Sequence, residues 1–222
     1  MRSKLFSLRE IVVTYRVRLW TLIAFCLAIT AAAEPGDRRT ILFMGDSLTA
    51  GYGLEEGLAF PALIRAKIDS LGMPFDVVSA GLSGETSSGG LRRIDWLLRR
   101  KIDVLVLELG ANDALRGVPL EVTRQSLQGI VEKSKMKYPD VKIVIAGMEA
   151  PPNLGVDYTA AFRDLFVDLA RAHDADLVPF LLAGVAGRPE LNLPDRIHPS
   201  EQGHAILAEN VWEVLGPLLK TF

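Results

Sequence analysis

Two short segments, far apart in the chain, carry the residue types of nucleophilic catalysis. The first reads Gly45-Asp46-Ser47-Leu48, and the second contains Asp195-Arg196-Ile197-His198-Pro199. A serine hydroxyl becomes a useful nucleophile only beside a general base, and in Asp-x-x-His the carboxylate can fold back onto the imidazole and fix its tautomer. Taken alone, each segment is more typical of a surface turn. Taken together, they predict that Ser47, His198 and Asp195 serve as nucleophile, base and orienting acid.

Two further segments could stabilise the negative charge that such a reaction places on a carbonyl oxygen. The Gly/Ser-rich loop 80–90 contains Gly84 and could point backbone N–H groups outward, while Asn112 could present its side-chain amide. A flexible connection with a Ser or Thr helix cap is an equally good interpretation of the loop, and an Asn in a turn usually bonds its own backbone. The position of these residues in the chain favours the catalytic interpretation.

Short apolar runs alternate with amphipathic stretches from residue 40 onward, which is typical of a parallel sheet covered by helices. Residues 104–107 are apolar on both faces, as central parallel strands are. Apolar residues at helical spacing predict helices near 60–71, 91–98, 162–169 and 206–218, and a weaker helix covers 119–137, with Pro119 in its first turn. The predicted strands are Thr40–Met44, Asp76–Ser79, Asp103–Leu109, Val141–Ala146 and Leu177–Val178. The sequence therefore predicts an α/β protein with a five-stranded parallel sheet.

The candidate residues fall where such a sheet binds its ligands. Sites in open α/β sheets lie beyond the carboxyl ends of the strands. Ser47, Gly84 and Asn112 follow the first, second and third predicted strands. We therefore expect these three residues to meet at one edge of the sheet, and the segment with Asp195 and His198 to supply the base there.

Together the four segments resemble the SGNH, or GDSL-type, serine hydrolase family, and within it the group of acyl-CoA thioesterase I, lysophospholipases and arylesterases. The resemblance implies a flavodoxin-like, three-layer α/β/α fold over residues 34–222. It also implies that Ser47, His198 and Asp195 are catalytic and that Ser47, Gly84 and Asn112 form the oxyanion hole. Glu85 stands where many relatives have Asp, and Ala111 where some have Gly.

The first 33 residues have the order of a secretory signal peptide. Five basic residues and one acidic residue precede or begin an apolar stretch, which ends in Ala31-Ala32-Ala33. We expect cleavage after Ala33 and a periplasmic or secreted protein. The rival interpretation, an uncleaved membrane anchor, has only the 15 residues Leu19–Ala33, against the ~20 that span a bilayer.

Composition narrows the class of protein further. The 222 residues carry 25 Lys plus Arg and 27 Asp plus Glu, and residues 34–222 carry a net charge of −6, so no basic surface predicts nucleic-acid binding. The single Cys excludes a disulfide framework, and the three histidines form no metal-binding motif. His173 and His204 are expected to be surface or packing residues, and Glu108 has no evident partner. No cofactor or metal is expected.

The predicted function is therefore an exported serine esterase that acts on small-molecule esters and thioesters through an acyl-serine intermediate. No Gly-x-Ser-x-Gly occurs, which argues against an α/β-hydrolase, and no P-loop is present. Two alternatives stay open: a carbohydrate acetylesterase of the same fold, and a catalytically silent binding module that uses the same cleft.

Overall fold

The chain folds around a parallel sheet whose strands are those that the apolar runs predict. The structure is a computed structural model, and it describes residues 38–222; the predicted signal peptide, residues 1–33, lies outside the described residues. The strands are β1 (Arg39–Gly45), β2 (Phe75–Gly81), β3 (Val104–Glu108), β4 (Lys142–Ala146) and β5 (Asp176–Val178). Their ends lie within two residues of the predicted ends.

The predicted helices are present, and short ones follow several strands. The longer helices are α3 (Phe60–Ser70), α4 (Ser87–Leu97), α6 (Leu120–Lys137), α7 (Val156–Ala172) and α8 (Glu201–Leu219). The short ones, which the sequence pattern did not predict, are α2 (Ser47–Ala50), α5 (Ala111–Leu115), η1 (Pro152–Leu154) and η2 (Pro189–Leu191). Pro119 precedes α6 in an extended conformation (φ −55°, ψ 134°) instead of lying in its first turn.

The strand order β2-β1-β3-β4-β5 is that of flavodoxin-like sheets. All neighbouring pairs are parallel, and Gly45 at the end of β1 is in register with Gly81 on one side and Glu108 on the other. The chain leaves β1 toward β2 and later returns to place β3 on the opposite side of β1. In sheets with such a reversal, ligands bind beyond the carboxyl ends of the two strands between which it occurs, here β1 and β3.

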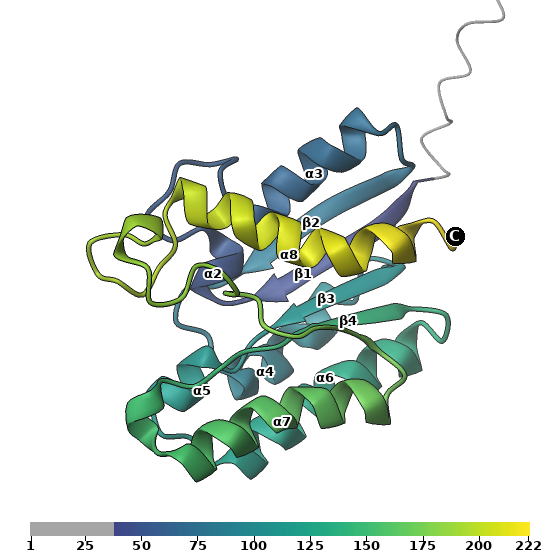
Figure 1. The fold of residues 1–222 in the computed structure, drawn as a ribbon. Coiled ribbons are helices and arrows are strands. Elements are labelled where there is room, and N and C mark those ends of the chain that lie inside the picture. Colours follow the sequence, from purple (N-terminus) through teal and green to yellow (C-terminus); the bar gives the residue numbers. More distant parts are fainter. Residues whose placement is uncertain (1–37) are drawn as a thin grey trace, which may run out of the picture. The chain divides into compact units, whose positions relative to one another are not determined.

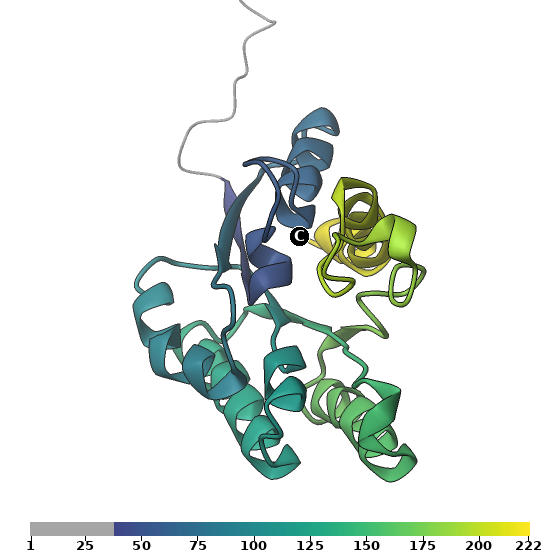
Figure 2. The same ribbon diagram turned by 90° about the vertical axis from the view of Figure 1, so that its left-hand side faces the viewer.

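Helices cover both faces of the sheet, as a sheet that is apolar on both sides requires. Helices α3 and α8 pack together on one face, and α4, α6 and α7 form the other layer (Figure 1). Figure 2 shows the two helical layers from the edge where the strands end. The central strand β3 is completely buried, and α3 turns Phe60, Ile64 and Ile68 into the core. The predicted three-layer α/β/α fold is confirmed.

Among residues 38–222, no helix is long and apolar enough to cross a bilayer.

Candidate active site

Ser47 begins α2 at the carboxyl end of β1. Gly51 ends this four-residue helix in the left-handed conformation, with φ 73°, which glycine adopts without steric cost. Asp46, the residue before the helix, accepts a hydrogen bond from the Leu48 N–H at 3.0 Å. The tight turn leaves Ser47 only 9% exposed, next to the strand ends.

The segment 192–200 brings His198 onto Ser47 from the other end of the described chain. His198 Nε2 lies 3.0 Å from Ser47 Oγ, and His198 Nδ1 lies 2.7 Å from Asp195 Oδ2. Because Asp195 accepts at Nδ1, the Nδ1–H tautomer leaves Nε2 free to accept the serine proton. The structure thus brings together the three residues that the sequence analysis named as nucleophile, base and acid.

Asp195 is held by the backbone of its own turn. Its Oδ1 accepts hydrogen bonds from the N–H groups of Ile197 at 2.9 Å and His198 at 3.0 Å. These two bonds, together with the bond to the His198 side chain, lower the pKa of Asp195 to about 2. The carboxylate therefore stays ionised at any pH where His198 could act as a base.

Tyr52 packs against the imidazole of His198 and was missed by the sequence analysis. The two ring centroids are 4.4 Å apart with an interplanar angle of 38°. This contact limits the rotation of the histidine ring, although 51% of Tyr52 remains exposed. The signal available in the sequence was an aromatic residue between two glycines, Gly51-Tyr52-Gly53, shortly after a candidate nucleophile.

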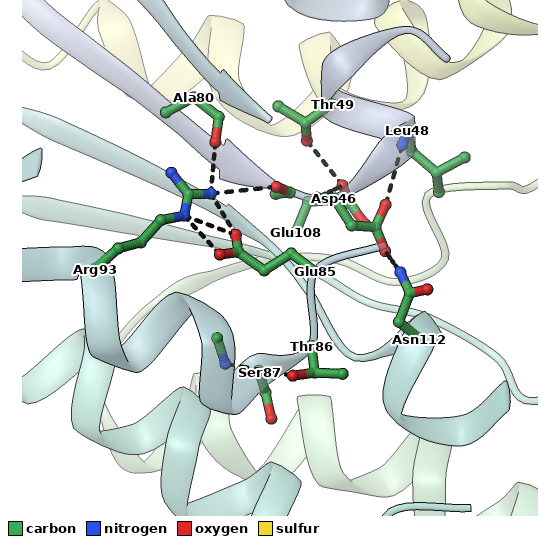
Figure 3. A network of polar contacts seen from close by, with 12 residues as sticks. Asp46, Leu48, Thr49, Ala80, Glu85, Thr86, Ser87, Arg93, Glu108 and Asn112 are labelled. Carbon is green, nitrogen blue, oxygen red and sulfur yellow. Dashed lines mark hydrogen bonds and ion pairs between the residues drawn. The ribbon is translucent and has the colours of Figure 1, made fainter. Parts of the chain in front are cut away.

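Gly84 and Asn112 lie in the segments that follow β2 and β3. Gly84 has φ +78°, and its carbonyl accepts a hydrogen bond from Arg116 Nη2 at 2.8 Å. Asn112 is the second residue of α5, and its Nδ2 donates to Asp46 Oδ2 at 2.8 Å (Figure 3). That contact places the Asn112 amide beside the Ser47 turn rather than on its own backbone, so the turn-forming alternative is wrong for this residue.

The buried carboxyl group of Glu108 supports the turn that contains Ser47. Glu108 is fully buried at the end of β3, where its Oε2 accepts from the Asp46 N–H at 3.1 Å and the Thr49 hydroxyl at 2.8 Å (Figure 3). These are the partners that sequence analysis could not identify. Burial, followed by the nearby Asp46 carboxylate, raises the pKa of Glu108 well above its usual range. These surroundings favour the neutral form of the Glu108 carboxyl group.

An ion pair fixes the loop that contains Gly84. Glu85 is 7% exposed and binds Arg93 Nε through both carboxylate oxygens, at 2.6 and 2.8 Å. Arg93 Nη2 also donates to the Ala80 carbonyl at 2.7 Å (Figure 3). The guanidinium group thus ties the middle of α4 to the end of β2, and Glu85 anchors the loop to it.

His204 is a packing residue, as expected, and contacts Phe60 at the start of α3. It is 1% exposed in α8, and its Nδ1 accepts the Phe60 N–H at 3.1 Å. Burial, and to a lesser extent the positive charge that His198 can carry, lowers the pKa of His204 to about 4. Within residues 38–222, no group of His, Cys, Asp and Glu side chains is arranged to hold a metal ion.

The fold and the nucleophile–base–acid geometry are those of a serine hydrolase of the three-layer α/β type, and comparison with known proteins specifies the family. The profile of the GDSL-like Lipase/Acylhydrolase family matches residues 43–206, and the chain belongs to this family. This assignment confirms the resemblance inferred from the four sequence segments.

Individual relatives match over nearly their whole length. Esterase TesA of Pseudomonas aeruginosa is 36% identical over 199 residues, which cover 89% of this chain and 98% of that protein. The thioesterase 1/protease 1/lysophospholipase L1 of Escherichia coli is 35% identical over 196 residues, covering 88% and 91%. A crystal structure of TesA superposes with a TM-score of 0.78 at 37% identity, covering 81% of this chain and 99% of that one.

Proposed function

We propose that this protein is an exported serine hydrolase that cleaves carboxylic esters and thioesters of small molecules through an acyl-serine intermediate. The observation that carries the proposal is the continuous hydrogen-bonded chain from Ser47 Oγ through His198 to Asp195. Membership of an acylhydrolase family, with relatives named esterase and thioesterase, supports the choice of an ester bond as the target.

In the first half of the reaction, Ser47 Oγ attacks the carbonyl carbon of the substrate while His198 Nε2 removes the hydroxyl proton. Asp195 stabilises the resulting imidazolium through the bond to Nδ1. The carbonyl oxygen becomes an oxyanion, which we assign to the N–H groups of Ser47 and Gly84 and the Nδ2–H of Asn112. When the tetrahedral intermediate collapses, the C–O or C–S bond breaks and His198 returns the proton to the leaving alcohol or thiol.

In the second half, a water molecule takes the place of the leaving group. His198 removes a proton from this water, which attacks the acyl carbon and regenerates a tetrahedral oxyanion in the same hole. The collapse of this intermediate releases the carboxylic acid and returns the proton to Ser47 Oγ. Every proton is therefore carried by His198, and neither a cofactor nor a metal is needed.

The proposal is tested with a series of p-nitrophenyl esters from acetate to palmitate and with purified residues 34–222. We expect hydrolysis that is lost in Ser47→Ala and retained in Ser70→Ala, which removes an exposed hydroxyl from the end of α3. A fluorophosphonate probe should label the wild-type protein and not Ser47→Ala. Activity on acetylated sugars alone would favour the acetylesterase alternative, and a folded protein without activity or labelling would favour the binding module.

The oxyanion donors should contribute less than the nucleophile. Loss of one such donor typically costs about 10²- to 10³-fold in kcat, so Asn112→Ala should retain measurable activity. Ser47→Ala and His198→Ala should be far more damaging, since they remove groups that take part in every proton transfer. If folded Asn112→Ala proved as inactive as Ser47→Ala, the assigned roles would be wrong.

Export is tested separately. The proposal places the mature amino terminus at Glu34, after Ala33. Expression of the full chain in a bacterium, followed by cell fractionation and intact-mass measurement, should give a periplasmic or extracellular protein that begins at Glu34. A full-length product in the membrane fraction would instead favour the anchor.

A further inference from the structure

The carboxylate of Asp46 bonds one of the three groups that we assign to the oxyanion hole, the Asn112 amide, and the backbone N–H that follows a second one, that of Ser47. Its Oδ2 accepts from Asn112 Nδ2 at 2.8 Å, and its Oδ1 accepts from the Leu48 N–H at 3.0 Å (Figure 3). Asp46 is only 1% exposed, so neither bond competes with bulk water. One side chain therefore spans the segments that follow β1 and β3.

The bond to Leu48 fixes the direction of the Ser47 N–H. Helix α2 has only four residues, too few to be stable without outside support. Its first N–H groups have no partner inside the helix, and the Asp46 carboxylate satisfies that of Leu48. Since the peptide planes of so short a helix turn together, the same bond sets the orientation of the preceding N–H, on the nucleophile itself.

The bond to Asn112 fixes the direction of the second donor. A side-chain amide carries two N–H groups on one nitrogen in a rigid plane. With one N–H directed at Asp46 Oδ2, the plane is set and the other N–H is available for a substrate oxygen. Without an acceptor at this place, the amide could rotate and present its carbonyl oxygen to the oxyanion, which would repel it.

We propose that Asp46 is the positioning residue of the oxyanion hole: its two carboxylate oxygens hold the Asn112 amide and the Ser47 turn in one fixed geometry. This inference rests on the proposed function and deepens it. Asp46 acts through the donors and not on the substrate. The role needs two acceptors opposite two donors, which an ionised carboxylate supplies and an amide does not.

The buried carboxyl group of Glu108 is compatible with an ionised Asp46. Burial and the nearby Asp46 carboxylate raise the pKa of Glu108, and the neutral form that this favours limits the repulsion between the two acids. Burial raises the pKa of Asp46, while the bonds from Leu48 and Asn112 act in the opposite direction because they stabilise the charged form. The same two bonds that position the donors thus also favour the charged form of this carboxylate.

The test is a double-mutant cycle between Asp46→Asn and Asn112→Ala. An Asn at position 46 keeps the shape of the side chain and one of its two acceptor oxygens. Its NH₂ group replaces the other oxygen and faces either the Leu48 N–H or the Asn112 amide, where two donors cannot form a hydrogen bond. We expect Asp46→Asn to lower kcat by about 10- to 100-fold, less than the full loss of a donor, with KM changed less than about twofold. In the Asn112→Ala background the same substitution should lower kcat by less than about threefold, because the group that it positions is already absent.

Asp113→Asn is the matched control. Asp113, in α5, is a buried acid like Asp46. Its carboxylate accepts hydrogen bonds from Ser87 and Thr123 and makes none with the Asn112 amide. Its effect on kcat should be the same in both backgrounds. Circular dichroism and thermal melting establish that each variant is folded. An equal loss from Asp46→Asn in both backgrounds would overturn the proposal and leave Asp46 as a simple helix cap.

A readout without substrate separates this inference from the proposed function. The side-chain NH₂ signals of Asn112 in an ¹⁵N-correlated NMR spectrum are identified by their loss in Asn112→Ala. They should shift in Asp46→Asn and stay in place in Asp113→Asn. Unmoved signals would refute the positioning role even if the enzyme is active. Shifted signals in a protein that hydrolyses no ester and binds no fluorophosphonate would support the contact while the proposed function fails.

Discussion

Replacement of His204 should remove a large part of the acid sensitivity of the fold. His204 is buried in α8 as a neutral ring whose Nδ1 accepts the Phe60 N–H, so a proton can be added at Nδ1 only by breaking that bond. Its pKa is about 4 in the folded chain, against an ordinary value of 6.5. Above pH 6.5, His204 is neutral in both the folded and the unfolded chain and does not affect the free energy of unfolding. As the pH falls from 6.5 toward 4, the unfolded chain takes up a proton that the folded chain does not, and the free energy of unfolding decreases.

The size of the effect follows from these two values. Between about pH 7.5 and about pH 5, the unfolded histidine becomes almost fully protonated while the folded one stays mostly neutral. Proton linkage then lowers the free energy of unfolding by about 2 kcal/mol, and by about 3 kcal/mol near pH 4. The free energy of unfolding of a domain is typically about 5–15 kcal/mol, so this decrease is a measurable fraction of it.

The assay is urea unfolding of residues 34–222 at both pH values, followed by circular dichroism, for wild type and His204→Asn. The Asn oxygen can take the place of Nδ1 as acceptor for Phe60, but it loses the ring that stacks on Phe60 with centroids 6.3 Å apart. His204→Asn should therefore be less stable at both pH values, with a pH-dependent loss smaller than that of wild type by about 2 kcal/mol. His173→Asn, at the end of α7 and outside the core, should keep the wild-type loss. Equal pH dependence in wild type and His204→Asn would refute the reasoning.

Two further substitutions test the contacts that support the Ser47 turn. Glu108→Gln should leave stability near pH 4 little changed and raise it relative to wild type as the pH increases. Because the pKa of Glu108 is raised in the folded chain, its contribution to the free energy of unfolding is fully present below the ordinary pKa of 4.5 and is progressively lost above it. Gln does not titrate and keeps its contribution at every pH. Parallel curves of unfolding free energy against pH for the two proteins would contradict this. Gly45→Ala should lower the free energy of unfolding by about 1–3 kcal/mol, because the added Cβ would lie 2.7 Å from the Glu108 carbonyl and would collide with the Thr49 hydroxyl. A urea midpoint unchanged from wild type would show that the turn is less tightly packed than described.

Much of the fold could be predicted because the signals are local. A strand buried on both faces must be apolar throughout, and Val104–Leu107 is so in sequence and structure alike. Ser47 and Asn112 could be placed near each other because the carboxyl ends of parallel strands share one edge. The Asp195–His198 pair lies within a single turn, so its spacing alone was informative.

The contacts that the sequence did not predict depend on strand register and on side-chain direction. Thr49 reaches Glu108 only because Gly45 and Glu108 are paired across β1 and β3. The stacking of Tyr52 on His198 joins two loops whose conformations have no periodic signal. Short helices such as α2 are similarly hidden, since four residues are too few to show an apolar period.

The distance along the chain between the proposed nucleophile and the proposed base has a consequence for when activity can first appear. The Ser47–His198 hydrogen bond spans 151 residues, whereas Asp195 and His198 are three residues apart. Contacts of such long range form late, because the intervening chain must be ordered before they are made. A partly folded chain, even one with most of its sheet assembled, would hold an oriented histidine and an unactivated serine. Hydrolysis would therefore begin only when the last helix docks, and the appearance of activity during refolding would time the completion of the native fold.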